Sequence, residues 1–342
     1  MYKKTLSIIV GVLIIHILSL RFVFAEASHP NTGMYNAMMT YSERIVTRES
    51  LSAKEAAVEK YAQMDMDGFI TTVEATLPET VSVRPGIEAD ICRMAQMYLK
   101  KDNGDYADKV YASLLLYAAN YEQIKNTVAS DAFSANSNYL PIYLAVAYDS
   151  VYSYYQDDEY IITSIINNKN VSNSLKQRIS AVNDVKAYIE ENFRTMAETV
   201  YIMIEGKYAN NLSGYLVKKL AGIGLILDDP DIIRYAIAVI DLAFDESQWA
   251  ADGMWFEGTT SYMSQLYGNI LEAMQIINKY KDPTGYKEDK IKLGLKLNAT
   301  DISDRWEIIG ITAGVNNNIY YPNGEAVAIH DTHPSYRTYE QQ

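Results

Sequence analysis

The chain is poor in cysteine, histidine and positive charge, and each shortage removes a class of site or partner. A single cysteine, Cys92, cannot form an intramolecular disulfide, and its place among apolar helix positions predicts a buried thiol. The four histidines form no cluster with cysteine, so neither a metal nor a cofactor is expected. With 30 basic against 43 acidic residues, the net charge of −13 argues against nucleic acid as a partner, because that binding requires Lys and Arg on phosphates.

Residues that break helices are also scarce. The 342 residues include only 17 Gly and 8 Pro, while 49% are hydrophobic. Together with long runs of Ala, Leu, Ile and Tyr, this composition favours a mostly helical protein. Tyrosine dominates the aromatic residues, with 29 copies. Such an excess suits half-buried rings that line a groove, and it equally suits ordinary packing between helices.

The N-terminus carries the features of a secretory signal peptide over Met1–Ala25. Two lysines precede the apolar run Thr5–Leu20, and a small-x-small site ends at Ala25. The run is shorter than the roughly 20 residues of a spanning helix, so we predict cleavage after Ala25, with an uncleaved signal anchor as the alternative. Cleavage would remove three basic residues and no acidic one, taking the charge from −13 to −16. The mature chain is expected to be secreted or periplasmic, without membrane association.

Helical periodicity runs through most of the remaining chain. We predict helices over Ser52–Met66, Ile87–Lys100, Asp105–Ala119, Leu140–Tyr155, Asp158–Asn167, Ser174–Glu205, Leu212–Leu227, Asp231–Asp245 and Thr259–Tyr280. A polar loop is predicted over Asn120–Asn138. Antiparallel helix pairs with short polar joints suit an α/α toroid or a helical solenoid. The lack of a fixed repeat period favours the toroid.

The composition changes after Lys281, where a charged stretch rich in Gly and Pro begins. In Trp306–Tyr321 apolar residues are interspersed with Gly and Asn, which predicts short strands or loops. The predicted organisation is a signal peptide over residues 1–25, an incomplete α/α toroid over residues 26–285, and a short β or loop segment over residues 286–342. This last segment is interpreted as the start of a truncated β-sheet domain, or as a linker.

The segment Asp252–Gly268 combines a turn, large aromatic side chains and the start of a helix. The hydroxyls of Thr259–Ser261 can cap that helix. Tyr262, Gln265 and Asn269 recur at three- and four-residue steps and so share one helix face. Aromatic rings stack on sugar rings and amides hold hydroxyls or carboxylates, so this pattern suits a sugar polymer. The alternative is a helix N-terminus with an aromatic staple into the core.

The same segment resembles the Asp-Gly-x-x-x-Glu-x-x-x-x-Tyr segment of the heparinase II/III-like polysaccharide lyases. Three further segments fit that family in the same order, namely Leu144–Tyr155, Tyr208–Ile233 and Tyr320–Ser335. The resemblance covers residues 139–335 and implies an N-terminal α/α toroid followed by a β-sheet domain. A whole sheet does not fit before Gln342, so we expect an N-terminal portion of a longer enzyme or an incomplete site.

The resemblance implies β-elimination on a uronate-containing glycan. One group neutralises the C6 carboxylate, a base removes the C5 proton, and an acid protonates the leaving oxygen. The family's tyrosine falls on Tyr262, as proton donor and in one version also as base. Its neutralising asparagine falls on Asn210 or Asn211, for which a helix N-cap is the other interpretation. Many relatives have a histidine beside that asparagine, whereas Leu212 follows the pair here.

Substrate binding is assigned to five residues around these positions, namely Tyr215, Trp255, Phe256, Glu257 and Gln265. The Trp and Phe rings are interpreted as stacking platforms or as core residues, and Glu257 as support for its loop. Lys218, Lys219 and Arg234 are the nearest basic residues and could offset the acidic mean, although a solvated face is the alternative for both lysines. The remaining catalytic group of the family belongs to the β domain. His330 and His333 map to no catalytic role and are interpreted as exposed loop residues.

The hyaluronate and chondroitin lyases offer a second resemblance, since they share the toroid and a comparable Asp-Gly…Tyr…Tyr-Gly segment. That group usually has Asn-Trp at the asparagine position and a histidine ahead of the tyrosine, where this chain has Asn211 followed by Leu212, and Glu257. Both families predict a secreted lyase acting on an acidic polysaccharide. The alternatives are a secreted glycan-binding protein without a complete site, and a purely structural helical repeat protein.

Overall fold

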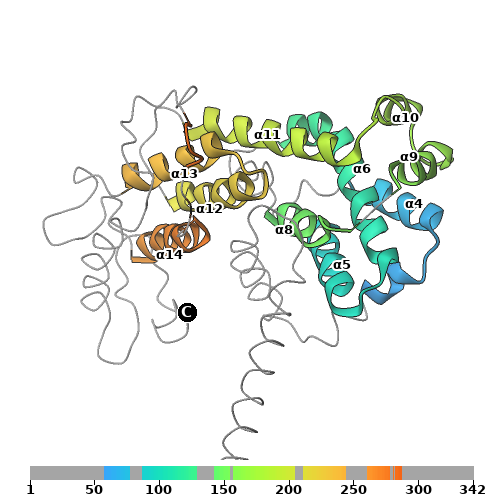
Figure 1. Cartoon of the computed structure of the whole chain (residues 1–342), viewed down its shortest axis with the longest axis horizontal. Helices are drawn as coiled ribbons and strands as arrows, with labels where there is room; N and C mark the ends of the chain where they lie inside the picture. Colours follow the sequence, from blue (N-terminus) through green and yellow to red (C-terminus); the bar gives the residue numbers. More distant parts are fainter. Residues whose placement is uncertain are drawn as a thin grey trace, which may run out of the picture.

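The structure is a computed structural model, which describes residues 58–77, 87–128, 142–154, 157–204, 211–243, 260–277, 280 and 282–286. This part is mostly helical and contains no strand (Figure 1), so the predicted class is confirmed. None of the helices in these ranges has both the length and the apolar character needed to span a lipid bilayer. The predicted signal peptide and residues 287–342 lie outside the described residues.

The helices follow one another with short joints. They are α4 (Met66–Thr76), α5 (Ile87–Lys101), α6 (Gly104–Val128), α8 (Ile142–Val151), α9 (Asp158–Asn167), α10 (Asn173–Ile179), α11 (Val185–Ile204), α12 (Asn211–Ile226), α13 (Pro230–Ala243) and α14 (Thr260–Ile277). Residues 58–62 form a further helical turn before α4. The predicted bounds agree for α9 and lie within a few residues for α5, α12, α13 and α14.

Two sequence predictions are wrong in the first half of the chain. The predicted Ser52–Met66 helix does not reach its end, because Asp65 caps a separate helix, α4, by accepting the N–H of Gly68 at 2.8 Å. The loop predicted over Asn120–Asn138 is helical over its first nine residues, where α6 continues to Val128. Tyr121 and Ile124 extend the buried face of α6, which explains the longer helix.

The long helix predicted over Ser174–Glu205 is also wrong, since the chain forms α10 and α11 with a break between them. The carboxylate of Asp184 accepts the N–H of Ala187 at 2.9 Å and so caps the start of α11. Val182 in the break is buried. Its apolar side chain continues the helical periodicity of the sequence and conceals the interruption.

α5, α6 and α8 pack as alternating antiparallel neighbours. The ring of Tyr98, near the end of α5, packs on Tyr154, just after α8, with 5.5 Å between centroids. The hydroxyl of Tyr111, in the first half of α6, donates to the carbonyl oxygen of Val151 at 3.0 Å. The ends of α5 and α8 therefore meet the beginning of α6. α5 and α8, which are in contact, run parallel to each other and antiparallel to α6.

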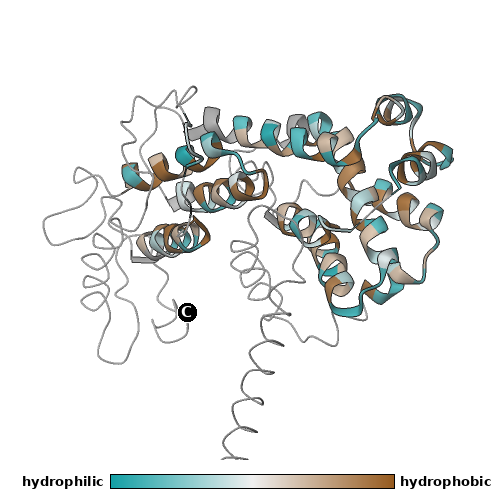
Figure 2. Ribbon diagram, in the orientation of Figure 1, coloured by the Kyte–Doolittle hydropathy of each residue, from teal (hydrophilic) through white to brown (hydrophobic). Residues whose placement is uncertain are grey.

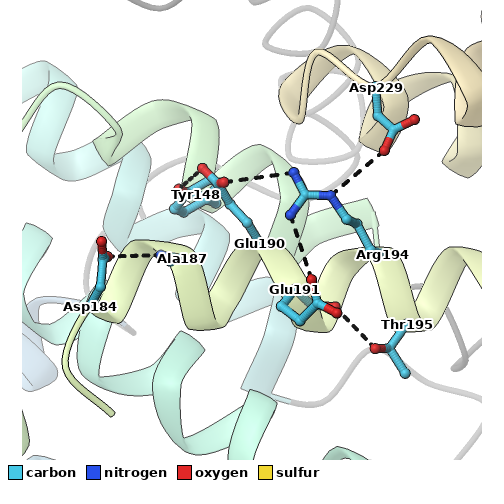
Figure 3. A network of polar contacts seen from close by, with 8 residues as sticks. All are labelled: Tyr148, Asp184, Ala187, Glu190, Glu191, Arg194, Thr195 and Asp229. Carbon is cyan, nitrogen blue, oxygen red and sulfur yellow. Dashed lines mark hydrogen bonds and ion pairs between the residues drawn. The ribbon is translucent and has the colours of Figure 1, made fainter.

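α11 runs antiparallel to α8. The Tyr148 hydroxyl donates to Glu190 at 2.7 Å, and Lys186, earlier on α11, donates to the carbonyl oxygen of Tyr152, just after α8, at 2.6 Å. Figure 3 shows how the network continues from Glu190 to Arg194. Arg194 lies 3.9 Å from Glu190 and 3.6 Å from Asp229, at the start of α13. α11 therefore lies alongside α8 and the α12–α13 joint.

α12 and α13 form a tight hairpin. Asp228 adopts the left-handed conformation, with φ of 50°, and the carboxylate of Asp229 caps α13 by accepting the N–H of Ile232 at 3.3 Å. A Cβ atom added at Gly224 would lie 2.6 Å from Cγ1 and 3.0 Å from the backbone nitrogen of Ile233. Only glycine allows the two helices to approach this closely.

α14 packs against α12 in the same direction. A Cβ atom added at Gly214 would lie 3.1 Å from the carbonyl oxygen of Leu266 and 3.1 Å from Cβ of Asn269. One turn further along α12, the Nζ of Lys218 lies 2.7 Å from Asn269 and 3.1 Å from Glu272. Residues later in α12 contact residues later in α14. The two helices are therefore parallel, and their first turns lie at the same end of their contact.

These contacts arrange the helices in two rows. α5, α8, α12 and α14 contact one another in that order and share one direction, and we call them the inner row. α6, α11 and α13 run in the opposite direction and pack against the inner row. Figure 1 shows α13, α12 and α14 stacked on one side of the molecule and α5, α6 and α4 on the other.

The core between the rows is rich in tyrosine. Five of the largest fully buried side chains are tyrosines, namely Tyr106, Tyr111, Tyr117, Tyr121 and Tyr148. The ring of Tyr148 makes edge contacts with Tyr111 and Tyr152 at centroid distances of 6.4 and 5.6 Å. Figure 2 shows hydrophobic residues on every helix of the array. In this part of the chain the tyrosine excess serves helix packing, and Cys92 is buried as predicted.

Candidate functional site

The sequence-predicted site residues that the structure describes lie on α12 and α14. Tyr262 and Gln265 occupy the first turns of α14, and Tyr215 lies in the second turn of α12. Asn211 is the first residue of α12, and its side chain is outside the described part. Further predicted residues fall outside the described ranges, namely Asn210, Trp255, Phe256, Glu257, His330 and His333.

The parallel packing of α12 and α14 brings two predicted catalytic positions to the same end of the seam between these helices. Gly214 lies opposite Leu266. Three residues earlier on each helix, Asn211 is level with Met263, the neighbour of Tyr262. Because both helices rise about 1.5 Å per residue, the backbones of Asn211 and Tyr262 lie within about one turn of the same level. Tyr262 is partly buried against the core.

A polar cluster follows along this seam, made of Tyr215, Lys218, Gln265, Asn269 and Glu272. The Lys218 ammonium donates to the Asn269 carboxamide oxygen at 2.7 Å and to the Glu272 carboxylate at 3.1 Å. The Asn269 amide nitrogen donates to the carbonyl oxygen of Gln265 at 2.7 Å. Both ends of the carboxamide are therefore held. The α12–α14 polar cluster joins the two helices directly below the turn that carries Tyr262.

Tyr215 connects this cluster with the surface. Its side chain is exposed to 37%, and the Lys218 Nζ lies 5.8 Å from the centroid of its ring. An ammonium at this distance is attracted by the ring quadrupole and helps to hold the ring in place. An exposed aromatic ring beside polar groups is a suitable platform for a sugar ring, which is compatible with the substrate-binding role predicted for Tyr215.

The solvated face predicted as the alternative for the two lysines is wrong. Lys218 and Lys219 are only 5% and 8% exposed, because neighbouring helices cover α12 on nearly all sides. Burial lowers the pKa of Lys218, an effect that the carboxylate of Glu272 opposes. Burial, together with the charge of Lys218, lowers the pKa of Lys219 to about 7. The ion pair with Glu272 therefore places the charge of Lys218, rather than that of Lys219, inside the seam.

Arg234 does not contribute to this site, although the sequence placed it near the asparagine pair. It forms an ion pair with Asp282, and the two side chains are only 10% and 7% exposed. Its Nε donates to Asp282 at 3.1 Å, and its guanidinium carbon lies 5.0 Å from the ring centroid of Tyr286, whose hydroxyl donates to Asp231. Arg234 therefore holds residues 282–286 against α13.

The close approach at Gly214 can be tested with a matched pair of glycine substitutions. Gly214→Ala should lower the free energy of unfolding by about 1–2 kcal/mol, because its Cβ would press on the backbone of Leu266. Gly268→Ala, on α14, meets no atom within 4 Å and should raise it by about 0.5–1 kcal/mol. Urea unfolding of both variants checks this prediction. A stabilising Gly214→Ala would contradict the tight seam.

The described residues form no metal site, and comparisons with known proteins identify no family for the chain. Among the described residues, no group of three or more His, Cys, Asp and Glu side chains is placed to hold a metal ion. Comparisons of the chain with protein-family models, with curated proteins and with solved structures gave no match. The lyase resemblance therefore rests on the sequence segments alone.

Proposed function

We propose that this chain is the helical part of a secreted polysaccharide lyase that cleaves a uronate-containing glycan by β-elimination. The observation that carries the proposal is the parallel α12–α14 pair, which brings Asn211 and Tyr262 to the same end of one seam. These are the positions to which the resemblance assigns carboxylate neutralisation and proton transfer. They are 51 residues apart in the sequence, so their common level in the fold is an independent reason to associate them.

The proposal includes the α/α toroid. Its support is the alternation of helix directions, in which four inner helices share one direction and the outer helices return in the other. An α/α toroid is built from such pairs. In a toroid the first turns of α5, α8, α12 and α14 would face one end of the ring. The resemblance assigns the family's remaining catalytic group to a β-sheet domain.

In the proposed reaction a base removes the C5 proton, a C4–C5 double bond forms, and the bond from C4 to the glycosidic oxygen breaks. Tyr262 gives a proton to that leaving oxygen, and the base is either the family's remaining catalytic group or Tyr262 itself, ionised before it takes the C5 proton. Asn211 or Asn210 hydrogen-bonds the C6 carboxylate and so makes the C5 proton more acidic. The first turns of α12 and α14 contribute positive partial charge, which favours a carboxylate at this end of the seam. Tyr215 provides a stacking surface for a neighbouring sugar.

The proposal predicts an unsaturated uronate product. The full-length protein should cause the ultraviolet absorbance to rise in a solution of at least one of four polymers, namely heparan sulfate, chondroitin, hyaluronan and alginate. Dextran, which has no uronate, should give a flat trace. Flat traces on all polymers would contradict lyase activity for this chain. Retained binding to an immobilised uronate polymer would then favour the glycan-binding alternative, and loss of both would favour a structural role.

A further inference from the structure

Lys218 is a buried charge that the fold alone does not explain. Among its neighbours on α12, Val217, Leu220 and Ala221 are buried and apolar, and Lys219 is a second buried lysine. Removing an ammonium from water is costly, and replacing a buried ion pair by well-packed apolar side chains is often neutral or stabilising. Lys218 is nevertheless placed between α12 and α14, one turn beyond the close approach of the two helices at Gly214.

We propose that Lys218 is a positioning residue for the turn of α14 that carries Tyr262 and Gln265, and that it acts through the carboxamide of Asn269. The catalytic meaning of this role rests on the proposed lyase function. The contact itself does not, because it is a feature of the helix seam.

The hydrogen bonds define the path of this effect. Lys218 holds the oxygen of the Asn269 carboxamide, and the nitrogen of the same group donates to the Gln265 carbonyl four residues earlier. A side-chain bond to the carbonyl four residues back adds to the helix ladder and influences the bend of that turn. Gln265 follows Tyr262 by three residues and shares its face. The orientation of Tyr262 relative to α12 thus depends on the Asn269 carboxamide.

The seam leaves little room for compensation. A Cβ atom at Gly214 would lie 3.1 Å from the Leu266 carbonyl oxygen and from the Asn269 Cβ, so α12 and α14 are in close contact here and no larger side chain fits between them. Glu272, whose side chain is 31% exposed, offsets the ammonium charge from the far side of Asn269. Loss of the ammonium would leave the Asn269 carboxamide oxygen buried without its charged donor, and the carboxamide would turn.

The central variant is Lys218→Met, which retains the length of the side chain and removes the charge. On the glycan that the protein cleaves, kcat should fall by about tenfold to hundredfold, because a small misplacement of a proton donor has effects of this size. KM should stay within about twofold, since Lys218 is not proposed to touch the substrate. The melting temperature should also fall, because the buried Asn269 oxygen and the Glu272 carboxylate both lose their charged partner. A lower melting temperature with an unchanged kcat would overturn the proposal.

Lys109 provides a matched control, because it is an equally buried lysine on α6, outside the α12–α14 seam. It is 4% exposed and donates to the carbonyl oxygens of Tyr61 and Met64 at 2.6 and 2.8 Å. Lys109→Met should lower the melting temperature and leave kcat within about twofold. A loss of kcat equal to that of Lys218→Met would show that any buried lysine matters, and would overturn the specific role.

Two further measurements test the path through Asn269. Asn269→Leu should reduce kcat by as much as Lys218→Met, and the double variant by no more than either single one, because residues that act through one another are not additive. A multiplicative loss would overturn the path. The second readout needs no substrate. The side-chain amide signals of Asn269 in a ¹H–¹⁵N spectrum, identified by their loss in Asn269→Leu, should shift in Lys218→Met and not in Lys109→Met.

The proposed lyase function and the positioning role of Lys218 can therefore be contradicted independently of each other. A wild-type protein without lyase activity contradicts the proposed function, while the Asn269 signals still report on the positioning contact. Signals that do not change in Lys218→Met overturn the positioning role, even in an active enzyme.

Discussion

Replacing Tyr262 by phenylalanine should lower the rate of unsaturated uronate formation by about 10²–10⁴-fold, the range over which a positioned proton donor accelerates such reactions. The substitution retains the ring, which packs partly buried against the core, and removes only the hydroxyl. Substrate binding should change little, so the loss should appear in kcat. The measurement is the ultraviolet progress curve on the glycan identified with the wild type, with a melting curve to establish that the variant is folded.

Tyr267→Phe is the control for this result. Tyr267 lies on the same helix, is also partly buried against the core, and projects from another face because five residues separate it from Tyr262. Loss of the Tyr267 hydroxyl should leave the rate within about twofold of the wild-type rate, a change well below that expected for a proton donor. Equal rates for wild type and Tyr262→Phe, or equal losses in the two variants, would remove Tyr262 from the reaction.

The largest effect on stability is expected at the ion pair between Arg234 and Asp282. Asp282→Ala should lower the free energy of unfolding by about 3–5 kcal/mol, because it leaves a buried guanidinium without its carboxylate. The Tyr280 hydroxyl, which donates to Asp282 at 3.1 Å, also loses its acceptor. Denaturant unfolding measures this difference.

Two comparisons separate this effect from the general loss of a charge. Glu59→Ala removes an ion pair with Lys101 whose side chains are 56% and 41% exposed, and it should change stability by less than about 1 kcal/mol. The double variant Arg234→Met with Asp282→Leu removes both buried charges and should recover most of the stability lost in Asp282→Ala. An Asp282→Ala variant no less stable than Glu59→Ala would refute the importance of the pair.

The helices were predictable where their signals are local. α9 begins after Asp157, whose side chain accepts the N–H of Tyr160, and a cap of this kind is visible in the sequence. The break before α11 also has a local signal in Asp184, but the apolar Val182 obscures it. The end of α6 could not be placed, because the polar composition after Asn120 favours a loop and only tertiary burial of Tyr121 reverses that preference.

Contacts between side chains that are far apart in the sequence could not be predicted from the sequence. Arg234 and Asp282 are 48 residues apart, and no periodicity connects them. The burial of Lys218 and Lys219 depends on the helices packed around α12, so a helix considered alone suggests a solvated face. The shared face of Tyr262, Gln265 and Asn269 did follow from spacing. The additional contact from Lys218 to Asn269 required knowing that α12 and α14 pack in parallel.

The tyrosine-rich core gives this protein an intrinsic spectroscopic signal of side-chain packing. The ring of Tyr148 lies nearly perpendicular to those of Tyr111 and Tyr152, at interplanar angles of 89° and 88°. Rings fixed in such an asymmetric setting give a near-ultraviolet circular dichroism signal, which disappears when specific packing is lost. Side-chain order and helix content can therefore be followed separately on the unlabelled chain. A variant that keeps its helices while its core loosens would lose the near-ultraviolet signal and retain the far-ultraviolet signal.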